Sequence, residues 1–345
     1  MQYRYIPFLL WKSGEQKGLK LIKESVAKSD VFPLVTVTDE TFADQAETIR
    51  SPAVPAAIVF TEELMKYWGA RPFYLDASAI QPPTKGVHPF IETAARCREE
   101  GARLTPAIRL GANEPYEAAV IEVARIDKRG VALVVNLDEF NSAVEWMPNW
   151  LLAPEDTDLI VDLADNVEAV AALGSVLQIA FRNLHRAREW RTVTIAGTSM
   201  PENFADYARD GVHLIERKEW RIWRDLAGAS LPYRLDYGDY ATVPIRDQQT
   251  KYATGFPISV RYMLPTHFLI PRGVRTRGEG SKDQSPQLIA HANTIMRYEK
   301  RSRLDCWADD EIDRIARKEV SPNTLGHWVS IGVNRHITRV RTDLP

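Results

Sequence analysis

The sequence predicts a (β/α)8 barrel of the TIM type. Eight short apolar segments recur along the chain, and each is followed by a polar residue and a stretch long enough for a helix. The segments begin about 30 residues apart, which is the length of a strand–helix unit. Strands that are apolar throughout and alternate with helices belong to parallel sheets covered on both faces. Eight such units close a barrel.

The eight predicted strands are Tyr5–Leu10, Pro33–Thr38, Pro72–Asp76, Leu104–Leu110, Val131–Leu137, Asp158–Leu163, Thr192–Gly197 and Tyr233–Tyr237. The first helix is indicated by Leu19, Ile22 and Val26, because these apolar positions are three and four residues apart. Val212–Glu216 fits either a further strand or the approach to a helix. We favour the second interpretation, because a ninth strand would prevent closure.

The regular alternation of strand and helix ends after the last predicted strand. The chain is therefore divided into a barrel (1–245) and a C-terminal α+β appendage (246–345). The appendage is expected to pack beside or over the barrel mouth. Its expected elements are a hairpin of Pro257–Met263 and His267–Pro271, helices at Gln287–Tyr298 and Asp309–Lys318, and a final strand at Gly332–Val340. A flexible basic loop is expected at Gly273–Gly280. Its arginine-containing part, Arg272–Arg277, is either a cationic lid over an acidic mouth or a solvated surface loop, and we favour the surface loop.

The composition excludes several classes of protein. With 45% hydrophobic and 26% charged residues, the 345-residue chain is globular in character. The net charge of −2 does not indicate nucleic-acid binding, although it leaves a local basic patch open. The apolar run near the N-terminus is too short for a signal sequence, no run is long enough for a membrane span, and two cysteines make no disulfide framework. A cytoplasmic protein is expected.

Polar residues gather where the predicted strands end, and in a barrel these ends meet at one mouth. The candidate catalytic residues are Glu15, Asp76, Asp162 and Asp239. The candidate substrate-binding residues are Lys12, Arg109, Asn136, Ser199 and Tyr240. Asp76, Asp138 and Asp162 are the candidate ligands for Mg²⁺, the one cofactor considered, because this ion prefers carboxylate oxygens. Crowded carboxylates also shift one another's pKa, which allows one to act as acid and another as base.

The strongest candidates are Asp76 and Asp162, because both stand inside apolar segments, where a carboxylate needs a partner. Arg109, in the strand between them, is the expected partner, and the three are predicted to form one partly buried cluster at the mouth. Two other interpretations stay open. An acid after a strand is often the N-cap of the next helix, and a buried ion pair can be purely structural.

Other motifs give weaker signals. GEGS lacks the strand and helix of a phosphate-binding loop, and TSMP lacks the glycines of a nucleophile elbow. The histidines do not form an HExxH motif, and His336 is expected to be a cap or core residue rather than a metal ligand. Trp220 and Trp223 are expected to pack rather than to stack on bases.

Several segments together resemble the "beta" proteins of satellite phages, prophages and bacterial genomic islands. They are IPFLLWKSGEQKGL, ERKEWRIW with LDYGDY, ISVRYM, CWADDEIDRIA and TLGHWVSIGVNRHI. The match extends over essentially the whole chain. Val329 and Arg335 depart from the pattern, where an arginine and a histidine are expected. The resemblance implies a mobile-element protein with a role in anti-phage defence, and it implies no particular reaction.

Three hypotheses of function remain. In the first, the protein is an enzyme that hydrolyses or binds a phosphorylated or nucleotide-like molecule: Arg109 and Lys12 engage the anion, and Glu15 or Asp239 moves a proton. In the second, it is a sensor that binds a phage component and passes the signal to a partner protein of a defence module. In the third, it is a structural subunit, a role that the nine tryptophans would serve if several are exposed.

Overall fold

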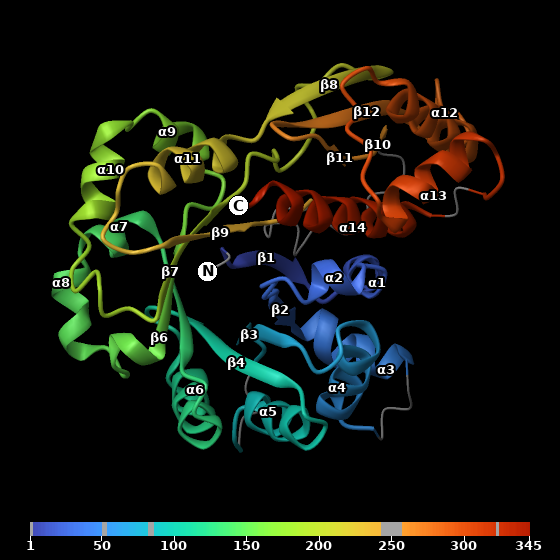
Figure 1. Cartoon of the computed structure of the whole chain (residues 1–345). Coiled ribbons are helices and arrows are strands. Elements are labelled where there is room, and N and C mark those ends of the chain that lie inside the picture. Colours follow the sequence, from blue (N-terminus) through green and yellow to red (C-terminus); the bar gives the residue numbers. More distant parts are fainter. Residues whose placement is uncertain (1–2, 50–53, 82–85, 243–256, 322–323) are drawn as a thin grey trace.

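The computed structural model is a closed barrel of eight parallel strands with a smaller α+β unit at one side (Figure 1). It describes residues 3–49, 54–81, 86–242, 257–321 and 324–345. The strand order is β1-β2-β3-β4-β5-β6-β7-β9, and β1 pairs with β9 to close the barrel. The predicted TIM-type barrel is therefore confirmed.

All eight predicted barrel strands are present, and their bounds shift by three residues or fewer. They are β1 (Tyr5–Leu10), β2 (Leu34–Thr38), β3 (Pro72–Ala79), β4 (Arg103–Arg109), β5 (Val131–Val135), β6 (Thr157–Asp162), β7 (Thr192–Gly197) and β9 (Leu235–Asp239). Between them lie α1 (Ser13–Lys20), α2 (Glu24–Ala27), α3 (Gln45–Ile49), α4 (Ala56–Tyr67), α5 (Pro89–Glu99), α6 (Glu114–Asp127), α7 (Leu137–Asn141), α8 (Ala143–Trp146), α9 (Val167–Ala171), α10 (Ser175–Arg182) and α11 (Lys218–Ala227). A π-helical turn covers Glu40–Asp44, and two 3₁₀ turns cover Met147–Asn149 and Pro154–Asp156.

The barrel interior is a packed core, because every second residue of each strand points inward. This interior cluster includes Ile6, Phe8, Leu34, Tyr74, Ala107, Ala132, Val134, Ile160, Ala196 and Tyr240. Gly238 lets strands approach closely here, since a Cβ atom at this position would lie 2.9 Å from the Cβ of Ala196 and 3.1 Å from the carbonyl oxygen of Ile6. The alternate residues of the strands form a larger core with the surrounding helices.

The prediction for Val212–Glu216 was wrong. Gly211–Glu216 is a strand, β8, but it leaves the barrel closed because it pairs antiparallel with β12 (His267–Arg275) in a separate sheet. The strands β10 (Pro257–Ser259) and β11 (Tyr262–Met263) pair with β12 as well. The antiparallel pairing expected in the appendage is thus confirmed, and the helices expected beside it are α12 (Gln284–Arg297) and α13 (Trp307–Ala316).

The predicted final strand at Gly332–Val340 was also wrong, because this segment lies within a long helix, α14 (Leu325–Asp343). The helix is covered on two sides: Val333, Ile337 and Val340 join the barrel core, while Trp328 and Ile331 join the core of the appendage. Apolar residues on two faces obscure the helical period of the sequence.

Two glycines of α1 let α14 approach the barrel wall. A Cβ atom at Gly14 would lie 2.9 Å from the side chain of Val329, and one at Gly18 would lie 2.8 Å from that of Val333. The division of the chain at residue 245 stays a prediction. The expected loop at Gly273–Gly280 is shorter than predicted, because β12 extends to Arg275, and Arg272 within this strand is buried.

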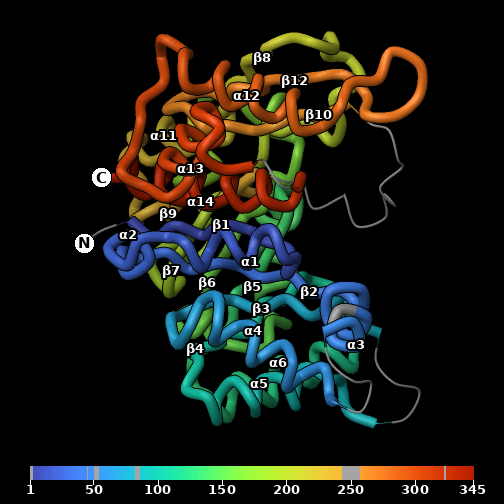
Figure 2. The backbone as a smooth tube through the Cα atoms, turned by 90° about the vertical axis from the view of Figure 1, so that its right-hand side faces the viewer, coloured from blue at the N-terminus to red at the C-terminus, as the bar shows by residue number. Residues whose placement is uncertain are grey.

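The two ends of the barrel are different surfaces. The chain termini lie at the end where the strands begin, on the left of Figure 2. The strands end, and the candidate residues follow them, at the opposite end, the mouth. No helix within the described residues is long and apolar enough to cross a membrane.

Candidate functional site at the barrel mouth

Three side chains from separate strand ends meet at the mouth. Arg109 ends β4, Asp162 ends β6, and Tyr240 follows β9. The Nη2 atom of Arg109 donates to Oδ2 of Asp162 at 2.9 Å, and the hydroxyl of Tyr240 lies 2.7 Å from both carboxylate oxygens. We call these residues the mouth triad. None of the three strands is a neighbour of another, so the contacts cross the barrel interior.

The triad fixes a cation at the surface. The side chain of Arg109 is 42% exposed, whereas that of Asp162 is 4% exposed. Burial lowers the pKa of Arg109, but the charges of Asp162, Tyr240 and Asp76 outweigh it and hold the pKa above its ordinary value. Burial, followed by the charge of Asp162, raises the pKa of Tyr240 well above its ordinary value. A permanently charged guanidinium is therefore held by a buried carboxylate.

Asp76 lies near the triad without joining it by a hydrogen bond. It is buried, and its charge contributes to the raised pKa of Arg109. Its Oδ1 atom accepts the backbone N–H of Ser78 at 3.0 Å, and Asp162 accepts that of Ala164 in the same way at 2.9 Å. Both acids therefore stabilise the turn that follows their strand, and Asp162 also holds Arg109.

Glu15 is a buried carboxylate in the first turn of α1, directly after β1. Its Oε2 atom has no hydrogen-bond partner among the described residues. Burial raises the pKa of Glu15 to about 8, although backbone N–H groups and the charge of Lys12 act in the opposite direction. Glu15 can therefore gain or lose a proton close to neutral pH.

Asp239 belongs to a different cluster on the outer side of β9. It accepts hydrogen bonds from Tyr5 at 2.7 Å and Tyr237 at 2.9 Å, and its Oδ2 lies 2.7 Å from Nε2 of His336 in α14. Burial opposes ionisation, but His336 and Arg217 outweigh it and hold the pKa of Asp239 below its ordinary value. Burial lowers the pKa of His336. This pair fastens α14 to the barrel wall.

Ser199 follows β7 and lies beside the start of α11. Its hydroxyl donates to Glu219 and accepts the backbone N–H of Lys218 at 2.8 Å. Glu219 and Arg217 are both buried, and their charged groups lie 3.6 Å apart. Burial raises the pKa of Glu219 to about 7. Ser199 thus serves the junction between β7 and α11.

The remaining candidates are not brought to the triad by any hydrogen bond. Lys12 is a half-buried residue that precedes α1. Asn136 is the N-cap of α7, in a capping box with Glu139, and Asp138 is exposed in the first turn of that helix. The described residues contain no group of three His, Cys, Asp or Glu able to hold a metal ion. The structure therefore does not assemble Asp76, Asp138 and Asp162 as a Mg²⁺ site, and Asp138 lies in the exposed first turn of α7, where the helix dipole favours an acid.

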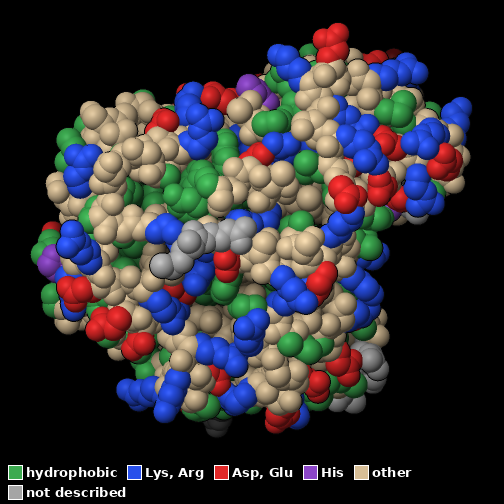
Figure 3. Space-filling model, viewed as in Figure 1, with side chains coloured by type: hydrophobic (Ala, Val, Ile, Leu, Met, Phe, Trp, Pro, Cys, Tyr) green, Lys and Arg blue, Asp and Glu red, His purple; other side chains and the backbone are tan. Residues whose placement is uncertain are grey.

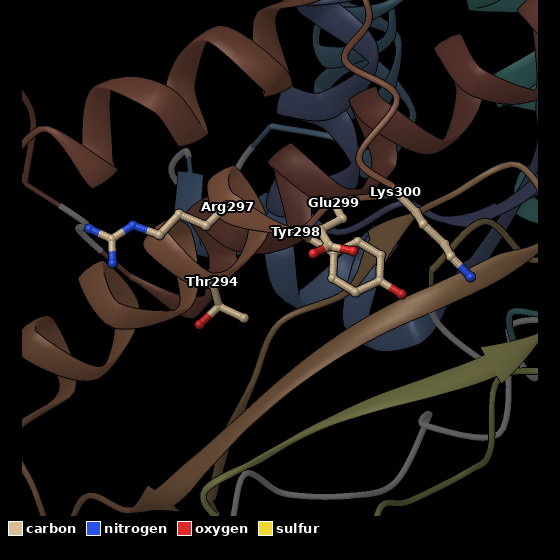
Figure 4. A pocket seen from close by; sticks show the side chains of 5 residues that line it. All are labelled: Thr294, Arg297, Tyr298, Glu299 and Lys300. Carbon is tan, nitrogen blue, oxygen red and sulfur yellow. The ribbon is translucent and has the colours of Figure 1, made fainter.

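A depression elsewhere on the molecule lies at the end of α12. It is lined by Thr294, Arg297, Tyr298, Glu299 and Lys300. Figure 4 shows that the charged ends of Arg297 and Lys300 point in opposite directions. These side chains do not converge on a common ligand position, so the depression is a poorer candidate than the mouth.

One protein family matches the chain over both the barrel and the appendage. The family model described as "Beta protein" matches residues 5–342. The chain belongs to the beta protein family. Membership suggests a protein of phages or mobile elements. No curated protein matches the chain.

In this beta protein, the segments that carry the family resemblance meet in space. ERKEWRIW supplies Arg217 and Glu219, LDYGDY supplies Asp239 and Tyr240, and the last segment supplies His336. Sequence reasoning treated His336 as a cap or core residue and did not pair it with Asp239, which is 97 residues away. The Arg–x–Glu spacing at the start of α11 was the one local signal for Arg217 and Glu219.

Proposed function

We propose that this beta protein acts in a phage or mobile-element defence system by binding a small anionic molecule at its barrel mouth. The ligand class is a phosphorylated or nucleotide-like compound. The observation that carries the proposal is the exposed guanidinium of Arg109, which is held by the buried carboxylate of Asp162. An arginine that uses one Nη atom on a protein partner keeps further N–H donors for a phosphate or carboxylate of a ligand.

The neighbouring residues support the same ligand class. Tyr240 holds the other side of Asp162, so the guanidinium is oriented before a ligand arrives. Such preorganisation reduces the entropy lost on binding. Lys12 adds a second cation at the end of β1. Glu15 is the residue we assign to proton transfer if the bound molecule is hydrolysed, since its pKa of about 8 allows both protonation states near neutral pH.

Native mass spectrometry of the purified protein with nucleoside mono-, di- and triphosphates tests the proposal, followed by calorimetry with the best binder. Arg109→Gln removes the charge and should weaken binding by about tenfold or more, as expected for a charge-assisted hydrogen bond. Arg314→Gln, at an exposed arginine paired with Glu311 in α13, is the control with the same loss of charge. Equal binding by the wild type and Arg109→Gln would contradict the proposal.

Turnover of the bound compound separates the enzyme from the sensor. An enzyme should convert the ligand, and Glu15→Gln should slow conversion more than it weakens binding. A ligand that is bound through Arg109 and never converted would identify a sensor whose effector is a partner protein. Absence of binding to the whole panel would contradict both forms of the proposal.

A further inference from the structure

The opposite end of the barrel carries arginines at the starts of six of the eight strands. We call these residues the arginine rim. They are Arg4 before β1, Arg71 before β3, Arg103 at the first position of β4, Arg129 shortly before β5, Arg191 before β7 and Arg234 before β9. Neighbouring parallel strands are about 5 Å apart, so the rim distributes cations around the barrel circumference.

Hydrogen bonds to backbone carbonyls orient four of these side chains. Each of the four side chains donates a hydrogen bond to a backbone carbonyl near the start of a barrel strand. Two of them donate through Nε and two through Nη1. The bonds are Arg71 Nε to Trp68 at 2.7 Å, Arg103 Nε to Ala70 at 3.2 Å, Arg129 Nη1 to Ala102 at 3.0 Å, and Arg191 Nη1 to Arg129 at 2.6 Å. The guanidinium groups are thus held in place along the rim rather than extended freely into solvent.

Two buried carboxylates hold the other part of the rim. Asp158 binds Arg191 through two hydrogen bonds and lies 3.4 Å from Arg4, while Asp236 pairs with Arg234 at 2.9 Å. Arg103 and Arg129 have no carboxylate partner among the described residues. Arg103 bonds its carbonyl through Nε and Arg129 through Nη1, so the Nη2 atom of each keeps its N–H donors for a ligand.

The wider surface at this end is also basic. Figure 3 looks onto the end of the barrel where the strands begin, and Lys and Arg side chains gather there. Helices contribute Arg98, Arg125, Arg182 and Arg224 from their last turns. The helix dipole accounts for cations at helix ends, but it does not account for arginines at strand starts. Acids at the same end offset part of this charge: Glu24 lies 3.3 Å from Arg71, Asp127 pairs with Arg98, Asp30 precedes β2, and Glu155 and Asp156 precede β6.

We propose that the arginine rim binds the phosphate backbone of a nucleic acid. Arg191 uses its donors on Asp158 and a carbonyl, so it helps to build the rim rather than to bind a ligand. Arg71, Arg103 and Arg129 stand at the starts of three neighbouring strands, β3, β4 and β5, and form a row along which successive phosphates of a chain can bind. Arginine binds phosphate through a planar pair of N–H donors. Contacts to phosphates alone carry no base sequence, so binding is independent of sequence and depends strongly on salt. The overall charge of −2 conceals this local surface.

Fluorescence anisotropy with labelled oligothymidine of about 20 nucleotides, and with a duplex of the same length, tests the proposal between about 50 and 200 mM salt. The double variant Arg103→Gln/Arg129→Gln leaves the buried pairs of Asp158 and Asp236 intact. Its slope of log affinity against log salt should fall by about 1.4 for the single strand, since each lost contact contributes about 0.7. Arg314→Gln/Arg317→Gln, at exposed arginines of the appendage, is the control with equal loss of charge.

The proposal is supported if the rim variant weakens binding, the control does not, and both melt at the wild-type temperature. Equal weakening by the rim variant and the control would overturn the proposal in favour of a general charge effect. Equal competition by polyglutamate would overturn it in favour of an acidic protein partner. Failure of the wild type to bind either oligonucleotide, or loss of binding only in Arg109→Gln, would also overturn it.

Discussion

Strand β6 places one buried aspartate at each end of the barrel, and the two have different surroundings. Asp158, at the start, receives two hydrogen bonds from Arg191, one from Tyr74 and one from Thr192, and it lies 3.4 Å from Arg4. Asp162, at the end, is bound by Arg109, Tyr240 and one backbone N–H. Both carboxylates are buried.

The difference lies in the arginines rather than the carboxylates. Arg191 uses Nε, Nη1 and Nη2 on protein atoms and is 30% exposed, whereas Arg109 contacts Asp162 through Nη2 and is 42% exposed. A pair whose donors are all engaged holds the fold together, and a pair with donors left over can also engage a ligand. The comparison therefore assigns Asp158 chiefly to stability and Asp162 chiefly to the site.

Asp158→Ala should give the largest loss of stability. The substitution leaves Arg191, Arg4 and the buried hydroxyl of Tyr74 without their common partner, and breaking a buried pair in this way costs about 3–5 kcal/mol. Urea unfolding at neutral pH measures the change in the free energy of unfolding. A loss of unfolding free energy below about 1 kcal/mol, as for an exposed ion pair, would contradict the assignment of Asp158 to stability.

Glu15→Gln should change stability mainly at alkaline pH. The pKa of Glu15 is about 8 in the fold and near its ordinary value of 4.5 in the unfolded chain, so its stabilisation is present below pH 4.5 and lost as the pH rises towards 8. The variant lacks this loss. Its free energy of unfolding should therefore exceed that of the wild type by on the order of 5 kcal/mol at pH 8.5 and by less than about 1 kcal/mol at pH 5.

The matched control for Glu15 lies at the other barrel end. Asp236 is also buried, but Arg234 and the backbone N–H of Arg4 bind its carboxylate. Asp236→Asn should destabilise the protein at pH 8.5, where Glu15→Gln stabilises it, because it removes the bonds that the carboxylate makes to Arg234 and to the backbone of Arg4. Parallel stability curves for the wild type and Glu15→Gln would show that Glu15 is ionised in the fold.

The outcome for individual elements shows which predictions a sequence supports. Strand β1 was predicted to the residue, because an apolar run with local boundaries is visible within a few positions. Strand β8 and helix α14 were not, since both are covered by partners distant in sequence: β8 by β12, and α14 by two separate cores. The local sequence pattern indicates how apolar a segment is. Whether such a segment becomes a strand or a helix depends on the elements that pack against it in the fold.

The residues of the candidate site were also predicted well where a local rule applied and poorly where distant partners decide. Arg109 and Asp162 were predicted as partners because each interrupts or ends an apolar strand, and the barrel fixes where strand ends lie. Asn136 and Asp138 satisfied the same rule and proved to be the cap and first turn of α7. Asp239 points to the outer side of β9, where His336 approaches from α14. A one-residue difference in strand position decides between the mouth and the outer wall, and no sequence rule separates them.

Asp162→Asn should give a moderate loss of stability. The amide keeps the size of the side chain and one oxygen acceptor for Ala164 or Tyr240, but it removes the charge that holds Arg109. A hydrogen bond to a charged group contributes about 1.5–3 kcal/mol, and the exposure of Arg109 reduces its share. The variant should lose about 1–2 kcal/mol in urea unfolding and should lose anion binding as well. Unchanged binding would mean that Arg109 does not need its buried partner.

Arg109→Lys should have the smallest effect on stability and the most specific effect on the mouth. Lysine keeps the positive charge beside Asp162, so the free energy of unfolding should change by less than about 1 kcal/mol. It lacks the planar pair of N–H donors, however, and so cannot hold Asp162 and a phosphate side by side in the same geometry. Calorimetry with the nucleotide found for the wild type should place its affinity between those of the wild type and Arg109→Gln. An affinity equal to that of the wild type would reduce the role of Arg109 to charge alone.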